Sequence, residues 1–248
     1  NTLNTRFFYK NNRGYNNAKQ LGHETDDQLT RTVTKMTYFQ DRFVSSIACG
    51  GFSTVAFTLP KSYQSYFPQS MHMIDEKTRA AEEEIYVYGY NSDSQLGVGL
   101  DLYTSSPVKL PKFGSSRIVD ICVGPINLLF LNAEGQVFIS GSNMYGQLAR
   151  EVMDDMTYSE PKRIHFFKNM KIIQISMRGW HYLVMTNDKK VYAVGNNNNG
   201  NCGIKTKHLD TPQEISEAIQ KETSREEIFD IHASYNCSFI FAGNKPTQ

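Results

Sequence analysis

Residues 89–97 read Gly-Tyr-Asn-Ser-Asp-Ser-Gln-Leu-Gly, and this stretch decides the fold because the chain repeats it. The same spacing recurs in residues 14–22, and two further copies begin at residues 141 and 195. The leading glycines lie 75, 52 and 54 residues apart, which is typical of a repeat architecture. The residues that define the repeat are Gly14, Asn16, Gln20, Leu21, Gly22, Gly89, Asn91, Gln95, Leu96, Gly97, Gly141, Asn143, Gly146, Gln147, Leu148, Gly195, Asn197, Gly200 and Gly203.

A second landmark follows each copy at a nearly constant distance. Isoleucine occurs at 47, 121, 175 and 231, which is 33, 32, 34 and 36 residues after the leading glycine. Two landmarks that shift together along the chain are strong evidence for a true repeat.

Each repeat carries the signals of short buried strands. β-Branched and aromatic runs precede the glycines, at residues 7–9, 85–88, 137–139 and 191–194, and further runs follow the isoleucines, at 55–57, 128–131, 182–185 and 239–241. Weaker pieces lie around residues 107–110 and 161–164. About four short strands per repeat predict an all-β, propeller-type array of about four four-stranded blades.

These residues resemble the regulator of chromosome condensation repeat family, whose units read strand-Gly-x-Asn-x-x-Gly-Gln-Leu-Gly and then Ile-x-x-Ile-x-x-Gly-x-x-His. The resemblance runs from about Arg6 to Gly243. Only His181 matches the histidine of this family pattern. In the other three repeats, the equivalent positions hold Ser53, Asn127 and Cys237. We expect one domain over residues 1–248, with units of about 6–58, 85–131, 137–186 and 191–243 and an insertion at 59–84.

Family members are typically seven-bladed, so four units predict an incomplete ring. Missing blades in a parent chain, an arc capped by a partner, and closure at an unusual blade number would each explain four units, and we favour the first two together. The chain begins at Asn rather than Met, so we expect it to be cut from something longer or processed.

The insertion is the candidate partner-binding segment, because long insertions between blades map to one rim of the disc. It is predicted to be partly helical, with Ser70 as N-cap and a helix from there to Glu84. Its aromatic and methionine side chains are of the types that anchor protein interfaces, although they could equally pack onto their own blade. These residues are Tyr63, Tyr66, Phe67, Met71 and Met73.

Composition and motifs exclude several classes of function. The formal charge of +1 argues against a nucleic-acid or anionic-lipid surface, and no run approaches the roughly 18 apolar residues of a membrane span. The four cysteines show no Cys-x-x-Cys spacing, which favours a reducing intracellular compartment: cytoplasm, nucleus or organelle interior. No phosphate loop, metal-ligand spacing or catalytic constellation is present, so we expect no cofactor, no metal and no small-molecule substrate.

The leading hypothesis is therefore a non-enzymatic protein–protein interaction or scaffold propeller, a subunit of a larger assembly. The resemblance implies an alternative, guanine-nucleotide exchange on a Ran-like or Ras-like small GTPase, which needs no nucleophile. A third hypothesis, a chromatin or nucleic-acid-associated propeller, depends on lysines of the C-terminal half and predicts salt-sensitive binding.

Overall fold

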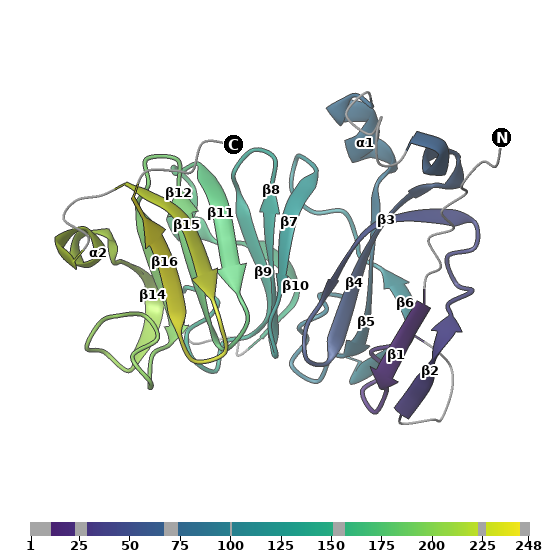
Figure 1. Cartoon of the computed structure of the whole chain (residues 1–248), viewed down its shortest axis with the longest axis horizontal. Helices are drawn as coiled ribbons and strands as arrows, with labels where there is room; N and C mark the ends of the chain where they lie inside the picture. Colours follow the sequence, from purple (N-terminus) through teal and green to yellow (C-terminus); the bar gives the residue numbers. More distant parts are fainter. Residues whose placement is uncertain are drawn as a thin grey trace.

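The computed structural model describes residues 11–22, 29–66, 74–99, 101–150, 157–222 and 227–243. They form sixteen strands, two α-helices and two 3-10 helices (Figure 1). The elements are β1 (Asn11–Tyr15), β2 (Leu29–Lys35), β3 (Arg42–Cys49), β4 (Ser53–Pro60), η1 (Lys61–Tyr66), α1 (Glu76–Glu82), β5 (Glu84–Tyr90), β6 (Tyr103–Lys109), β7 (Ile118–Val123), β8 (Asn127–Asn132), β9 (Val137–Ser142), β10 (Thr157–Arg163), η3 (His165–Phe167), β11 (Ile172–Met177), β12 (His181–Thr186), β13 (Val191–Asn196), β14 (His208–Glu214), α2 (Ser216–Glu222), β15 (Ile228–Ala233) and β16 (Ser238–Ala242).

The strands form three four-stranded sheets and two two-stranded sheets. The complete sheets are β3-β4-β5-β6, β7-β8-β9-β10 and β11-β12-β13-β14, and β1-β2 and β15-β16 are half sheets. Neighbouring strands are antiparallel in all of them. The predicted all-β class and four strands per repeat are confirmed. Each complete sheet, however, joins the last two strands of one sequence unit to the first two of the next.

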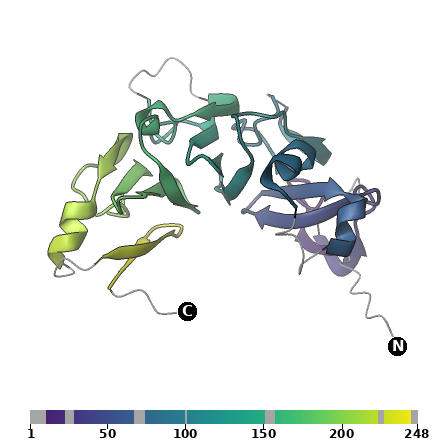
Figure 2. The same cartoon turned by 90° about the horizontal axis from the view of Figure 1, so that it is seen from above.

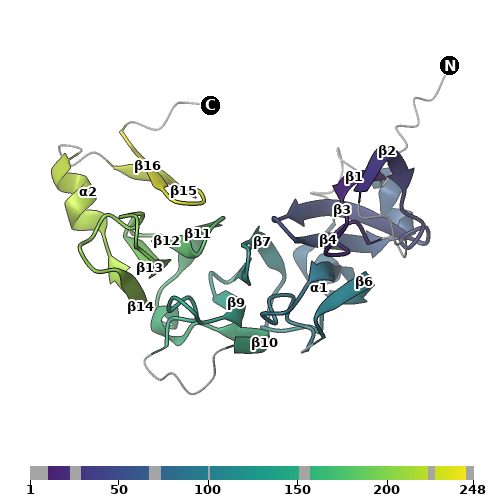
Figure 3. The ribbon, with the colours of Figure 1, turned by 90° about the horizontal axis from the view of Figure 1, so that it is seen from below.

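The sheets are arranged in an arc rather than a closed ring (Figures 2 and 3). The half sheet β1-β2 lies at one tip and the half sheet β15-β16 at the other (Figure 3). Strands β7, β11 and β15 lie toward the concave side, and β6, β10 and β14 lie toward the convex side (Figure 3). The incomplete ring predicted from the sequence is therefore confirmed.

The core lies between successive sheets. Leu129 and Leu131 of β8 belong to one buried cluster with Ile175 of β11, and Leu183 and Met185 of β12 belong to another with β15 residues. A third cluster joins the sheet that begins with β3 to the sheet that begins with β7. Each sheet is thus stabilised by burial of apolar surface against its neighbours, as a repeat array requires.

The leading glycine of three repeats is required by close backbone contact. Gly89, Gly141 and Gly195 have φ angles of 115°, 103° and 102°, and each lies opposite the first residue of the preceding strand of its sheet. A Cβ atom at Gly141 would lie 2.1 Å from the carbonyl oxygen of Ile126. Only glycine fits this conformation and this space.

The asparagine two residues after each glycine closes the following turn. The Oδ1 atom of Asn91 accepts a hydrogen bond of 2.9 Å from the backbone N–H of Leu96, five residues later. The other three repeats make the same bond, at 3.0, 2.9 and 2.7 Å from the N–H groups of Leu21, Leu148 and Cys202. The repeat signature is therefore a set of buried turns that return an apolar side chain to the core.

Two local predictions need qualification. Helix α1 begins at Glu76 with Asp75 as its N-cap, so the predicted helix start at Ser70 was wrong; residues 67–73 lie outside the described residues. The run at residues 7–9 also lies outside them, and the first described strand is β1.

Candidate interaction surface

The insertion connects β4 to β5 and places α1 at one rim of the arc, above β3 in Figure 1. Tyr63 and Tyr66 lie in η1, where the Tyr63 side chain is half-buried. The other three predicted partner-binding residues, Phe67, Met71 and Met73, lie outside the described residues. Their role in binding remains a prediction.

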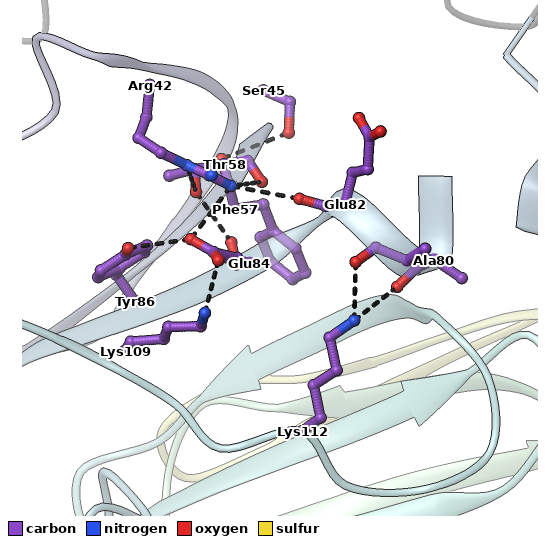
Figure 4. A network of polar contacts seen from close by, with 11 residues as sticks. Arg42, Ser45, Phe57, Thr58, Ala80, Glu82, Glu84, Tyr86, Lys109 and Lys112 are labelled. Atoms are coloured by element: carbon purple, nitrogen blue, oxygen red, sulfur yellow. Dashed lines mark hydrogen bonds and ion pairs between the residues drawn. The ribbon is translucent and has the colours of Figure 1, made fainter. Parts of the chain in front are cut away.

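Helix α1 has a side-chain cap at each end. The Asp75 carboxylate accepts hydrogen bonds from the backbone N–H of Thr78, at 2.9 Å, and from its hydroxyl, and these bonds lower the pKa of Asp75. At the C-terminal end, Lys112 Nζ donates to the carbonyl oxygens of Ala80 and Ala81 at 3.3 and 2.8 Å (Figure 4). Because Lys112 lies between β6 and β7, this contact ties the insertion to the body of the arc.

A charged cluster ties α1 to the neighbouring sheet. The buried Glu83 carboxylate lies 3.3 Å from Arg79 Nε and 3.9 Å from Arg117 Nη1, and Arg117 Nε lies 2.7 Å from Glu76 Oε1. Burial raises the pKa of Glu83, although the charges of Arg117 and Arg79 oppose this. Arg117 directly precedes β7, so one side chain links the helix to the second complete sheet.

A second network ties the end of the insertion to its own sheet (Figure 4). Arg42 of β3 donates to the Glu82 carbonyl oxygen at 3.2 Å and pairs with Glu84 at 3.2 Å. Lys109 and Tyr86 also donate to the Glu84 carboxylate. Burial opposes ionisation of Glu84, but these hydrogen bonds and the Arg42 charge outweigh it and lower the pKa.

Two pockets open beside the buried Glu83. One, of about 260 Å³, has an apolar wall that includes Leu110 and Phe113 and also exposes Lys112. The other, of about 330 Å³, lies between β3 and β7 and is lined by residues that include Ile47 and Asp120. We call α1, η1 and the walls of these two pockets the α1 platform. The platform therefore combines apolar and charged side chains at one rim of the arc.

The polar position opposite the leading glycine satisfies backbone groups in two repeats. Ser53 Oγ donates to the Tyr90 carbonyl oxygen at 3.1 Å, and Asn127 Nδ2 donates to two carbonyl oxygens of β9 at 3.0 and 2.8 Å. His181 differs, because its ring nitrogens lie 3.0 Å from Ser238 Oγ and 3.1 Å from Asn201 Nδ2. Burial lowers the pKa of His181 to about 4.

Burial disfavours ionisation of two of the four cysteine thiols. All four are free, and burial raises the pKa of Cys122 and of Cys202 to about 12. Within the described part of the chain, no group of three or more potential metal ligands comes together. The helices described here also include none that is long and apolar enough to cross a membrane.

Sequence reasoning missed the residues that hold the α1 platform. Arg42, Arg117 and Lys112 come from three different connections and strands, and only the fold brings them to α1. The available signal was local: Asp75 followed by Thr78, and the acidic run from Glu82 to Glu84 at the end of the insertion.

The fold and its repeated turns define this chain as a β-propeller repeat protein with an open arc. A model of the regulator of chromosome condensation (RCC1) repeat matches residues 82–125 and 134–185. A second model of the same description matches residues 172–201. The chain therefore belongs to the RCC1 repeat family.

Known proteins are similar to this chain in sequence. The chain is 33% identical over 187 residues to the ultraviolet-B receptor UVR8 of Arabidopsis thaliana, covering 75% of this chain and 37% of the relative. It is 29% identical over 178 residues to the human RCC1-like G exchanging factor-like protein, covering 66% of this chain and 34% of the relative. The chain thus spans about a third of the length of these relatives.

Solved structures agree on the fold. The structure of yeast RCC1 (Prp20) bound by Kap60 superimposes with a TM-score of 0.68 at 16% identity, covering 92% of this chain and 48% of that chain. The structure of human WBSCR16 superimposes with a TM-score of 0.64 at 22% identity, covering 89% of this chain and 52% of that chain. At these identities the likeness establishes the fold alone.

Proposed function

We propose that this chain is a non-enzymatic interaction module, a scaffold propeller that binds a protein partner at the α1 platform as part of a larger assembly. Tyr63, Tyr66, Phe67, Met71 and Met73 are the side chains proposed to contact the partner. The proposal needs no cofactor, metal or small-molecule substrate.

The observation that carries the proposal is how firmly the insertion is held. Arg117 and Lys112 connect α1 to the segment that leads into β7, while Arg42 connects it to β3. A surface fixed at several points loses little conformational entropy when a partner binds, which favours affinity.

The test is quantitative affinity capture with matched variants. The double variant Tyr63→Ala, Tyr66→Ala should lose the partner that the unaltered chain recovers. The control, Met144→Ala, alters an exposed side chain in the β9–β10 connection, at the opposite ends of the strands from the insertion. Equal recovery by all three proteins, each folded by circular dichroism, would contradict the proposal.

Guanine-nucleotide exchange is the second candidate. It is supported by the similarity to a relative that is named a G exchanging factor-like protein. Exchange factors act by displacing nucleotide, so the lack of a nucleophile does not count against this function. Release of labelled GDP from a panel of Ras-like and Ran-like GTPases tests it, and acceleration of one member would place exchange ahead of the scaffold role.

Nucleic-acid or chromatin binding ranks third. Lys189 and Lys190 lie in the β12–β13 turn, whereas Lys205 and Lys207 lie in the β13–β14 connection at the other end of β13. These lysines are therefore divided between two rims and form no single basic surface. DNA binding that weakens steeply with salt would raise this candidate.

We also propose that residues 1–248 act as one repeat domain in a reducing intracellular compartment. The continuous series of inter-sheet cores and the four free thiols support this proposal. Proteolysis that released a stable fragment of one or two sheets would argue against a single domain.

A further inference from the structure

The β6–β7 and β10–β11 connections correspond residue by residue. They begin at Leu110 and Ile164, each of which donates its backbone N–H to a carbonyl oxygen of the third strand of its own sheet, at 2.8 and 2.9 Å. Near their other ends, the carbonyl oxygens of Arg117 and Lys171 each accept, at 2.9 Å, from the N–H of the residue after the second strand of the next sheet. Six residues lie between these two points in both connections, so they align without a gap.

Ser116 occupies the position at which the β10–β11 connection carries Met170. Met170 packs against the buried cluster that joins the second complete sheet to the third. The serine side chain is too short for such a contact, and its Oγ atom is buried without a hydrogen-bond partner among the described residues. Phe113 is half-buried, whereas its counterpart Phe167 is only 2% exposed. A serine at this position therefore leaves space beside Phe113, and both residues line the same pocket.

This space is the pocket of about 260 Å³ in the α1 platform, and we call it the Phe113 pocket. Its apolar walls include Leu110, Phe113 and Ile118, while α1 contributes the small side chains of Ala80 and Ala81. No residue of α1 is buried, so the helix borders the pocket without filling it. A methionine of the chain itself takes the corresponding position in the β10–β11 connection. The Phe113 pocket therefore suits an apolar side chain that comes from outside the chain.

The exposed charge at this pocket is positive. The Lys109 side chain is 51% exposed and Lys112 is also exposed, whereas the side chains of Glu83 and Glu84 are only 4% and 21% exposed. Both carboxylates are already paired with basic side chains, but Lys112 Nζ contacts carbonyl oxygens of α1 (Figure 4). Glu134, which accepts from Ser115, does not line the pocket. A carboxylate beside the incoming apolar side chain would complement the two lysines.

We propose that the Phe113 pocket binds a methionine-like apolar side chain of a partner segment that carries an acidic residue next to it. The apolar side chain takes the place that Met170 takes in the β10–β11 connection, and the carboxylate lies near Lys109 and Lys112. An oxygen of the same segment accepts from the Ser116 hydroxyl, which otherwise stays unpaired at a cost in free energy. This inference rests on the proposed function, because it specifies the chemistry of the partner of the α1 platform.

Selection of random peptides displayed on phage tests the proposal. We expect the peptides enriched on the unaltered chain to carry Met, Leu or Phe beside Asp or Glu, and fluorescence anisotropy measures the affinity of synthetic copies. Ser116→Met should bind these copies at least about tenfold more weakly, because the new side chain fills the pocket. The control is Ser92→Met, the same change at an exposed position between β5 and β6, on the opposite rim. The control should bind like the unaltered chain.

A second variant tests the charges. Lys109→Gln with Lys112→Gln removes both positive charges but keeps a donor for the carbonyl oxygens of α1. We expect the affinity for the enriched peptides to fall roughly two- to tenfold at low salt, and the remaining affinity to depend less on salt. Circular dichroism and thermal unfolding of every variant show that a lost affinity does not reflect lost folding.

Several results would overturn the proposal. They are an absence of enriched peptides, enriched peptides without acidic residues, and equal affinity of Ser116→Met and the unaltered chain. Failure of the proposed function is distinguishable from these results. A partner that is lost by the Tyr63→Ala, Tyr66→Ala variant but kept by Ser116→Met would support the α1 platform and contradict the role of the pocket. A partner that is lost only by Ser116→Met would support the pocket and contradict the role of the two tyrosines.

Discussion

Asn91 should be among the most sensitive positions of the chain. Its Oδ1 atom accepts from the Leu96 N–H at 2.9 Å, and its Nδ2 atom donates to the carbonyl oxygens of Gly99 and Asp101 at 3.2 and 2.7 Å. The side chain is buried, so Asn91→Ala leaves three backbone groups without their partner. At roughly 0.5–1.5 kcal/mol for each net hydrogen bond, the expected loss is about 2–4 kcal/mol.

Urea and thermal unfolding measure this loss directly. For a chain of this size, each kcal/mol lowers Tm by roughly 2–4 °C, so we expect a decrease of about 4–16 °C. Amide hydrogen exchange at Leu96 should accelerate in the variant. The matched control is Ser92→Ala, because Ser92 is exposed and its hydroxyl contacts only the Asp93 carboxylate.

The variant Asn91→Asp separates the contribution of the bond that Asn91 accepts from the contribution of the two bonds that it donates. It keeps the acceptor for Leu96 but places a carboxylate against two carbonyl oxygens, so at neutral pH it should destabilise at least as much as alanine. Part of the stability should return in acid, where a protonated carboxyl can donate one hydrogen bond. A loss below about 1 kcal/mol for Asn91→Ala would refute the reasoning that these turns hold the repeat together.

Three further predictions concern buried positions. Burial lowers the pKa of His181 to about 4 from 6.5, so the unfolded chain binds the proton more tightly, and stability should fall by about 3 kcal/mol as the pH drops from 7 to 4. In urea unfolding measured at several pH values, His181→Asn should show a smaller loss of unfolding free energy between pH 7 and pH 4. An unchanged pH dependence would mean that other groups cause this loss. Gly141→Ala should cost at least about 2 kcal/mol, or abolish folding, because its Cβ meets the Ile126 carbonyl oxygen; a variant with unchanged Tm would contradict this. Tyr182→Phe removes a 3.0 Å hydrogen bond to the Gln147 carbonyl oxygen and should cost about 1 kcal/mol by the same unfolding assay, whereas an effect near zero would mean that the bond adds no net stability.

The repeat predicted the strands well because its signals are local. A glycine forced into a positive φ and an asparagine that accepts from the N–H five residues later both act within one turn, so they can be read directly from the sequence. The division into sheets could not be read this way. It depends on whether β2 pairs with β3, and β2 pairs only with β1 among the described strands, which is a non-local choice that spacing leaves open.

The α1 platform also depends on non-local contacts that the sequence could not predict. The helix start depends on which polar residue caps it, and both Ser70 and Asp75 were suitable by type; the Thr78 contacts identify Asp75. Glu84 and Glu83, which follow the helix, are paired with Arg42 and Arg117 respectively. The positions of these two arginines along the chain give no hint of this proximity.

The paired positions at each leading glycine explain why some repeat residues vary and others do not. Gly89, Gly141 and Gly195 are constrained by contact between backbone atoms, which no side chain can relieve. The residue opposite can vary more, because Ser53 and Asn127 donate to carbonyl oxygens of the adjacent strand, whereas His181 bonds to the side chains of Ser238 and Asn201. A hydroxyl, an amide and an imidazole therefore occupy equivalent sites in the complete sheets. Cys237 holds this position in the half sheet and is exposed, since the strand that would supply its glycine and carbonyl oxygens is missing from its edge in the described structure.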